Sequence, residues 1–204
     1  MVSYICYMKN GIIIAIAILL SVSTPVLGQT VLETFVLKEL NAYRKLNKLA
    51  PVIYSGNVSK AAVHHTQWMS GVNFDKMKKI MEIDDDSEAM SAHIETIDVP
   101  NFKELKTLED RGNFYGVISD ITSQWEICNM TPANTGNYFI SSQTPDDVLA
   151  KDIIKQFSQS PGHDMAMKID AKSAYAGIGV IVKEVTINGQ SYKIAYATIY
   201  FIEK

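Results

Sequence analysis

Apolar residues after Thr30 recur at the spacing of one helix face. They are Leu32, Val36, Leu40, Tyr43 and Leu46. Thr30 followed by Glu33 is a capping-box pattern, in which each side chain satisfies a backbone donor at the start of a helix. We expect this helix to end between Asn47 and Pro51, because a residue before proline avoids helical geometry.

Further helices follow from the same kind of pattern. Apolar and small residues share a stripe over residues 57–69, and residues 52–54 form a short extended piece before it. Another helix is predicted to begin at Thr144, which would cap it, with Pro145 in its first turn. A short helix over residues 163–169 is expected to follow it.

The remaining segments favour strands, apart from a helical turn or two over residues 102–108. Segments rich in β-branched and aromatic residues lie at 115–121, 125–128, 138–140, 175–185 and 192–202. Asn188–Gly189 between the last two favours a tight hairpin turn. Because both hairpin strands are apolar at nearly every position, they need helices on both faces. We therefore predict an α+β fold, a three-layer α-β-α sandwich with a C-terminal β-hairpin.

The N-terminal segment has the pattern of a secretory signal peptide. Lys9 precedes an apolar run over residues 12–20, and the small residue Gly28 closes the segment. A membrane-spanning helix needs about 20 apolar residues, so the short run favours a cleaved leader over an uncleaved anchor. The segment 1–28 is therefore predicted to be removed on export.

Export sets the expected location and domain organisation. Residues 29–204 have the length of one domain, with Gln29 as the expected mature start. Met1 and Met8 both remain open as the initiator. The predicted location is secreted, either periplasmic or extracellular, without a membrane span once the leader is removed.

Charge and cysteine content exclude other classes of protein. The formal net charge is -3, and no cluster of Lys and Arg indicates a nucleic-acid partner. Cys6 lies in the predicted leader, which leaves Cys128 alone and rules out an intramolecular disulfide after cleavage. We expect Cys128 to be a buried, small apolar residue. Residues 84–86 are three aspartates that favour a solvated loop, because the glycine and glutamate of a calcium loop are missing.

Four segments together resemble one known family. They are Leu40–Arg44 with Leu49–Val52, the sparse pattern of Val58, Ala62 and Met69, Phe157–His163, and Ala176–Val180. These segments are similar to those of the CAP superfamily (cysteine-rich secretory protein, antigen 5 and pathogenesis-related 1), and to its bacterial SCP-like extracellular proteins. The resemblance covers most of residues 31–201. Its specific part is Ser160–Pro161–Gly162–His163 with the Ile178–Gly179–Val180 element after it.

The resemblance implies a central cleft lined by two histidines and one or two glutamates, which in some members holds a divalent metal. Carried over residue by residue, it makes His163 the second histidine, His93 the candidate first histidine and Glu126 the candidate glutamate. Ser160 stands where longer members carry a second glutamate. The chain also departs from the family's pattern around these positions, at Trp125, Ile127, Cys128, Phe157 and Asp164.

The three cleft residues allow more than one chemistry. Two neutral imidazoles, His93 and His163, with the Glu126 carboxylate would suit zinc, leaving a position for water. The same groups could be a general acid–base pair or a hydrogen-bonded cluster that orients loops. The adjacent His64 and His65 point about 100° apart on a helix and cannot chelate together. We expect His65 to be packed and His64 to be solvated.

Two functions follow from these residues. The first is an extracellular or cell-envelope binding module, whose cleft contacts a lipid, an envelope component or a protein. The alternative is a metal-assisted hydrolase, such as a peptidase, in which Glu126 acts as a ligand or base. A third reading is a structural envelope protein with a vestigial cleft. The residues leave open whether the protein is an enzyme.

Overall fold

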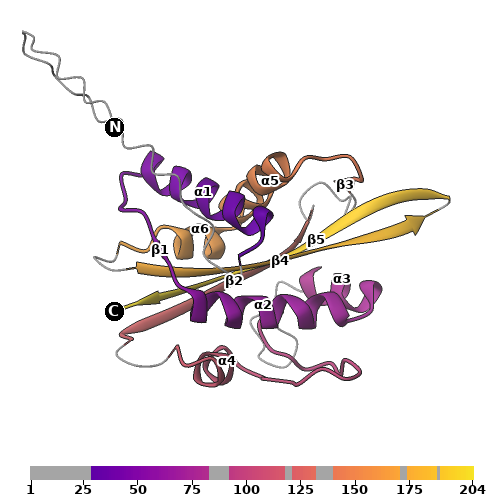
Figure 1. Cartoon of the computed structure of the whole chain (residues 1–204), viewed down its shortest axis with the longest axis horizontal. Helices are drawn as coiled ribbons and strands as arrows, with labels where there is room; N and C mark the ends of the chain where they lie inside the picture. The colour runs from indigo at the N-terminus through magenta and orange to yellow at the C-terminus, as the bar shows by residue number, and fades with distance from the viewer. Residues whose placement is uncertain (1–28, 83–91, 118–120, 132–139, 171–173, 188) are drawn as a thin grey trace, which may run out of the picture.

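A mixed β-sheet lies between two layers of helices (Figure 1). The computed structural model describes residues 29–204 apart from 83–91, 118–120, 132–139, 171–173 and 188, so the predicted signal peptide lies outside the described residues. The described helices are α1 (Val31–Leu46), α2 (Gly56–Gly71), α3 (Phe74–Glu82), α4 (Leu108–Phe114), α5 (Asp146–Gln159) and α6 (Pro161–Met167). The described strands are β1 (Ile53–Tyr54), β2 (Ser123–Thr131), β3 (Ile140–Ser141), β4 (Ala174–Ile187) and β5 (Gln190–Glu203).

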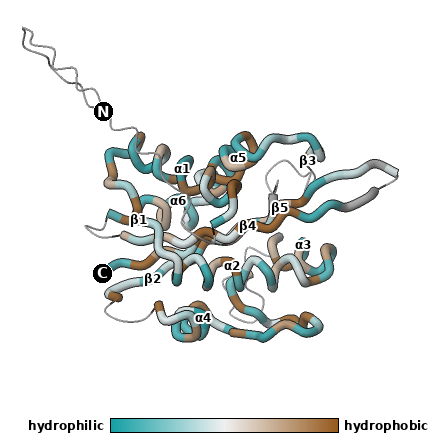
Figure 2. Tube along the Cα trace, in the orientation of Figure 1, coloured by the Kyte–Doolittle hydropathy of each residue, from teal (hydrophilic) through white to brown (hydrophobic). Residues whose placement is uncertain are grey.

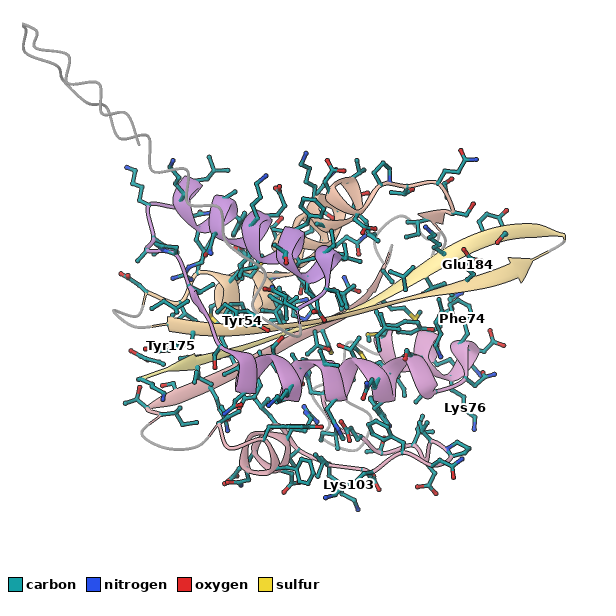
Figure 3. The ribbon with its side chains drawn as sticks, in the orientation of Figure 1. Tyr54, Phe74, Lys76, Lys103, Tyr175 and Glu184 are labelled. Carbon is teal, nitrogen blue, oxygen red and sulfur yellow. The ribbon has the colours of Figure 1, made fainter. Side chains whose placement is uncertain are left out.

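The long C-terminal hairpin forms the centre of the sheet. The strand order is β1-β4-β5-β2, and β3 also pairs with β5. β1 runs parallel to β4, and the other pairs are antiparallel. The predicted turn connects β4 to β5, and Gly189 there has a φ of 79°, which glycine adopts without strain. In Figure 3, Tyr54 and Tyr175 lie near one end of the molecule, and Phe74 and Glu184 lie toward the other.

Each face of the sheet is covered by its own helices. α1, α5 and α6 pack on one face, where a core cluster joins residues such as Leu40, Phe157 and Ile199. α2, α3 and α4 lie on the other face, where Trp68 and Ala62 are fully buried. Figure 2 shows hydrophobic residues recurring along β5, while the helices mix hydrophobic and hydrophilic positions. The predicted α+β class and layer order are therefore confirmed.

The helix start at Thr30 is confirmed in atomic detail. The Thr30 side chain accepts from the Glu33 N–H, and the Glu33 carboxylate accepts from the Thr30 N–H. At α5 the prediction was wrong by one residue: the cap position is Pro145, without a side-chain capping bond, and not Thr144. The helix that we expected over 57–69 is α2, longer at both ends.

The predictions between α2 and β2 were less accurate. Residues 102–107 form no helix; α4 begins only at Leu108, after the capping box of Thr107 with Asp110. The expected strand over 115–121 is not a strand in its described part, where residues 115–117 form a turn that ends α4. α3 was not predicted at all. Residues 84–86, read as a solvated loop, and most of 138–140 lie outside the described residues.

None of the described helices is both long enough and apolar enough to cross a bilayer.

We predict that Gly177→Ala destabilises the fold strongly. A Cβ atom at this position of β4 would lie 2.2 Å from the backbone N of Ser59 and 2.2 Å from the backbone C of Val58 in α2. Backbone atoms cannot move aside as a side chain can, so unfolding in urea should show a loss of about 3 kcal/mol. Gly56→Ala is the matched control, because nothing lies within 4 Å of its added Cβ. A loss at Gly177 no larger than at Gly56 would contradict this packing.

Candidate functional site

The three predicted cleft residues lie together at the edge of the sheet. His93, in the loop after α3, places its Nδ1 atom 3.2 Å from Oε1 of Glu126. The His93 and His163 rings lie edge to face, with centroids 6.5 Å apart and planes at 72°. His93 comes from the α2 side of the sheet and His163 from α6 on the other side. Side chains from the two helical layers therefore meet at the edge strand β2.

Strand geometry explains the position of Glu126. Residues two apart on a strand point to the same face, so Glu126 and Cys128 both point toward the α2 side. The Cys128 Sγ atom lies 3.7 Å from His93 Nδ1 and 3.7 Å from the Ala92 carbonyl oxygen. Cys128 is buried as expected, with 3% exposed, but polar groups surround its sulfur. Cys128 belongs to the hydrophobic core cluster that contains Trp68 and Met130, so the expectation of a buried, small residue is confirmed.

His163 is positioned by the packing of α6. This helix follows α5 directly, with Pro161 in its first turn, and the His163 ring packs edge-on against Phe157 at 5.3 Å. The buried Arg44 guanidinium in α1 holds the far end of α6, donating to the carbonyls of Met167 at 2.7 Å and Ile169 at 2.9 Å. Since these carbonyls lack helical partners, Arg44 fixes the end of the helix that carries His163.

The central group beneath His93 is the guanidinium of Arg111 in α4. Its Nη2 atom donates to both carboxylate oxygens of Glu126 at 2.8 Å, and to the His93 carbonyl at 3.3 Å. Its Nη1 atom donates to Oε1 of Glu95 at 3.4 Å. The side chains of Arg111 and Glu95 are 0% exposed, and that of Glu126 is 2% exposed. Such an ion network is stable only because its hydrogen bonds replace lost water.

His65 completes this network from α2. Its Nε2 atom lies 2.8 Å from the Ala92 carbonyl, and its Nδ1 atom lies 3.3 Å from Glu95 Oε1. Both partners are acceptors, so a protonated His65 satisfies both. Glu95 Oε2 also accepts from the Leu105 N–H at 2.8 Å, which ties the loop after α3 to the cluster. Two carboxylates, Arg111 and a His65 imidazolium together have no net charge.

The surroundings shift the pKa values of Glu126, Glu95 and His65 so that each group favours its charged form. Burial raises the pKa of Glu126, but the charges of His65 and Arg111 and the His93 hydrogen bond outweigh burial, so the pKa lies well below its usual range. Burial acts to raise the pKa of Glu95, but the nearby His64 and His65 imidazoles, the Leu105 N–H and the Arg111 charge together lower it. Burial acts to lower the pKa of His65, but the Glu126 charge together with the contacts to Cys128 and Glu95 raises it above its ordinary value. Both carboxylates are therefore ionised at neutral pH.

The two cleft histidines are shifted in opposite directions. Cys128 and Glu126 raise the pKa of His93 against the effect of burial. Burial and the charge on His93 lower the pKa of His163 to about 4. Burial acts to raise the pKa of the Cys128 thiol, but the charges and hydrogen bonds of His93 and His65 together lower it to about 7. At neutral pH, His93 is a cationic donor and His163 is a neutral imidazole.

The residues do not fit a metal ion in this arrangement. Within the part of the chain that the structure describes, no group of three His, Cys, Asp or Glu side chains is placed to hold one. The Glu126 carboxylate accepts two bonds from Arg111 and faces His93 Nδ1, so most of its acceptor sites are already occupied. Ser160, the fourth cleft candidate, occupies the junction of α5 and α6 and makes no side-chain capping bond.

His64 was expected to be solvated, and this expectation was wrong. It is 5% exposed, because α4 and the loop that carries Phe102 cover its side of α2. Its Nδ1 atom is 3.0 Å from the Tyr115 hydroxyl. Its Nε2 atom lies 3.5 Å from Glu95 Oε2, within ion-pair distance, and has no hydrogen-bond partner among the described residues. His65 is packed, as predicted.

Sequence reasoning missed Arg111, Glu95 and the network role of His65. One signal was available: only two of the 19 basic residues are arginines, Arg44 and Arg111. Both are buried and donate to several oxygens. A planar guanidinium with five donors suits this role better than the single ammonium of lysine. Another signal was the capping box at Thr107, which places Arg111 in a helix.

Comparisons with known proteins do not establish a family for this chain. No protein-family model matches the chain, and no curated protein matches it. A solved structure of an extracellular protein containing an SCP domain, from Bacillus anthracis str. Ames, is similar to it. The identity is 15%, the TM-score is 0.48, and the match covers 85% of this chain and 40% of that protein. A likeness at this level carries no argument about family or function, so the site must be interpreted from its own geometry.

We predict that Arg111→Met costs about 3–5 kcal/mol of unfolding free energy, because it leaves two buried carboxylates without their cation. Chemical denaturation at pH 7 measures this loss. Lys151→Met is the matched control, since Lys151 is 58% exposed and its Nζ atom is 4.0 Å from Asp147. The control should change stability by less than about 0.5 kcal/mol. Equal effects of the two substitutions would exclude a buried network.

The pKa of His163 gives a second prediction, measured by NMR of its imidazole nitrogens. His163 should titrate near pH 4, whereas His93 should still be protonated at pH 7. An unfolded histidine titrates near about 6.5, so the His163 contribution to stability is present above that pH and lost as pH falls toward 4. His93→Gln should raise the pKa of His163 only in part, because burial remains.

Asp147→Asn is the control for that titration, since this exposed residue lies in the first turn of α5. It should leave the His163 midpoint unchanged. A His163 midpoint near the unfolded value, or one that His93→Gln does not move, would show that the two rings do not interact.

Proposed function

We propose that this chain is an exported CAP-like module that binds a ligand outside the cell or at the cell envelope, through His93 and His163. The observation that carries the proposal is the placement of His93. Its side chain is 40% exposed, yet the buried Glu126 carboxylate fixes its Nδ1 edge. A ring held rigidly from behind and partly open to solvent is suited to recognise a polar group.

The ligand group that fits best is a hydrogen-bond acceptor or an anion. Cationic His93 can donate to such a group, and neutral His163, 6.5 Å away, can accept from a neighbouring O–H or N–H. A carboxylate, a phosphate or the amide of an envelope sugar would meet both requirements. Burial of Glu126 and Arg111 beneath His93 keeps the donor oriented before the ligand arrives, which reduces the entropic cost of binding.

The metal-assisted hydrolase is not favoured by this geometry. It would need Glu126 as a metal ligand or as a base, but Arg111 already binds both oxygens of that carboxylate at 2.8 Å. A carboxylate held in this way is a weak base, since its pKa lies well below the usual range. A binding function requires Glu126 neither as a metal ligand nor as a base.

We expect small polar probes to contact both rings. Acetate, inorganic phosphate and N-acetylglucosamine would be added separately to isotope-labelled protein, and the imidazole resonances followed by NMR. At least one probe should shift His93 and His163 together and saturate, with a dissociation constant of about 1 mM, equivalent to ~4 kcal/mol. The buried His64 ring, 5% exposed, is the internal control and should not move.

His163→Asn is the matched variant for this experiment. It keeps a polar side chain on α6 but removes the imidazole, so the response of His93 to the probe should weaken. If no probe shifts the two rings together, or if the response survives His163→Asn unchanged, the proposed binding site is wrong.

A further inference from the structure

We propose that the outer edge of β2 binds the C-terminal segment of a peptide or protein as an added strand, with its terminal carboxylate beside His93. The inference rests on the proposed binding function of His93 and His163, and it names the class of partner. It uses main-chain groups of β2 that the proposed function does not require.

β2 is a long edge strand without the usual protection of an edge. Within the described residues it pairs only with β5, over nine residues from Ser123 to Thr131. Edge strands are commonly protected by short length, or by lysine or proline. β1, at the opposite edge, has only two residues, whereas β2 contains neither lysine nor proline. β2 is therefore suited to pair with a further strand.

The hydrogen bonds of the sheet show which β2 residues face outward. In antiparallel pairs, alternate residues turn both main-chain groups to the same side. The Val180 N–H of β4 donates to Glu33 Oε1 at 3.4 Å, so Val180 faces away from β5. Its partner Ala197 then faces β2 and bonds to Asn129, which leaves Met130 facing the outer edge. The Met130 N–H agrees, since it donates to Asn129 Oδ1 at 2.7 Å.

By the same alternation, Gln124, Glu126 and Cys128 also turn their main-chain groups to the outer edge. No described residue hydrogen-bonds to the main-chain N–H or C=O of Gln124 or Glu126. The Glu126 side chain is 2% exposed but the residue as a whole is only partly buried, so its exposed surface belongs to the main chain. Cys128 is 3% exposed, so the open stretch ends at Glu126.

His93 lies at the closed end of this stretch. Its Nδ1 atom is 3.2 Å from Glu126 Oε1 and 3.7 Å from Cys128 Sγ. A strand that pairs with Gln124 and Glu126 must therefore end beside His93, because the edge beyond them is covered.

The charge of His93 determines which end of the added strand lies there. A cationic donor attracts a carboxylate and repels an ammonium, so the C-terminus lies beside His93 and the added strand runs parallel to β2. Main-chain bonds to Gln124 and Glu126 then supply affinity that does not depend on the partner's side chains.

NMR of the isotope-labelled full chain tests the proposal, with an N-acetylated tetrapeptide of valine and threonine as the probe. The amide signals of Gln124 and Glu126 should shift and exchange more slowly with solvent, together with a shift of the His93 imidazole. Trp125 and Ile127 are the internal controls, because their N–H groups face β5. The peptide should bind at least about tenfold more tightly than acetate, because it adds main-chain hydrogen bonds.

Changes to the peptide separate its two contacts. A C-terminal amide in place of the carboxylate should weaken binding about tenfold, because the charge that His93 attracts is lost. Methylation of successive peptide nitrogens should give two alternating sets. Methyl groups on nitrogens that face β2 should weaken binding about tenfold, and those on the other nitrogens should leave it unchanged.

Gln124→Pro removes one outward N–H, a change that edge strands tolerate. It should weaken peptide binding about tenfold and leave the response of His93 to acetate unchanged. Gln124→Ala is the matched control, because it keeps the N–H while both variants lose the hydrogen bond from the Tyr200 hydroxyl. If Gln124→Pro does not fold, the methylated peptides decide the question.

The proposal is overturned if the peptide leaves the Gln124 and Glu126 amides unmoved, if the acid and amide peptides bind equally, or if all methylated peptides bind alike. Such a result with acetate still shifting the His93 and His163 rings would leave the proposed function intact. If neither acetate nor the peptide shifts the two rings, both proposals are wrong.

Discussion

The guanidinium of Arg111 is the group on which the candidate site depends. It lies in the interior with no exposed surface and bridges the carboxylates of Glu95 and Glu126, which come from different parts of the chain. Removing such charges from water is costly, and the cost is recovered only when each charge is paired and hydrogen-bonded. Here α4 supplies the cation, β2 and the loop after α3 supply the anions, and His65 on α2 supplies a second proton donor.

This network determines how His93 is held in place. The loop that carries His93 has little regular structure, and its backbone is fixed by polar contacts: Glu95 accepts from the Leu105 N–H, and Arg111 donates to the His93 carbonyl. The exposed imidazole of His93 is therefore supported by groups that water does not reach. On the other side of the sheet, His163 depends on ordinary helix packing and on Arg44 at the end of α6.

The elements predicted correctly from the sequence are those whose determining residues lie close together in the chain. The capping box at Thr30, the hairpin around Gly189 and the helix start near Pro145 each depend on neighbouring residues, and each was predicted to within a few positions. His163 was found because it belongs to a contiguous motif. Arg111 and Glu95 were missed because their partners are brought close only by the fold: Arg111 contacts Glu126 across 15 positions, and His65 contacts Glu95 across 30. The strand expected near Val117 does not form. Residues with high strand propensity are mainly residues that favour burial. Val117 is buried in the segment after α4, so its burial needs no strand.

A double-mutant cycle between Arg111 and Glu126 tests the central claim most directly. Unfolding free energies would be measured for the wild type, Arg111→Met, Glu126→Gln and the double variant. If the two groups form a buried ion pair, the double variant should be more stable than Arg111→Met alone, because it no longer contains the unpaired Glu126 carboxylate, with a coupling of about 1–3 kcal/mol. Additive effects of the two substitutions would contradict the account, since they would mean that Arg111 and Glu126 do not interact in the folded protein.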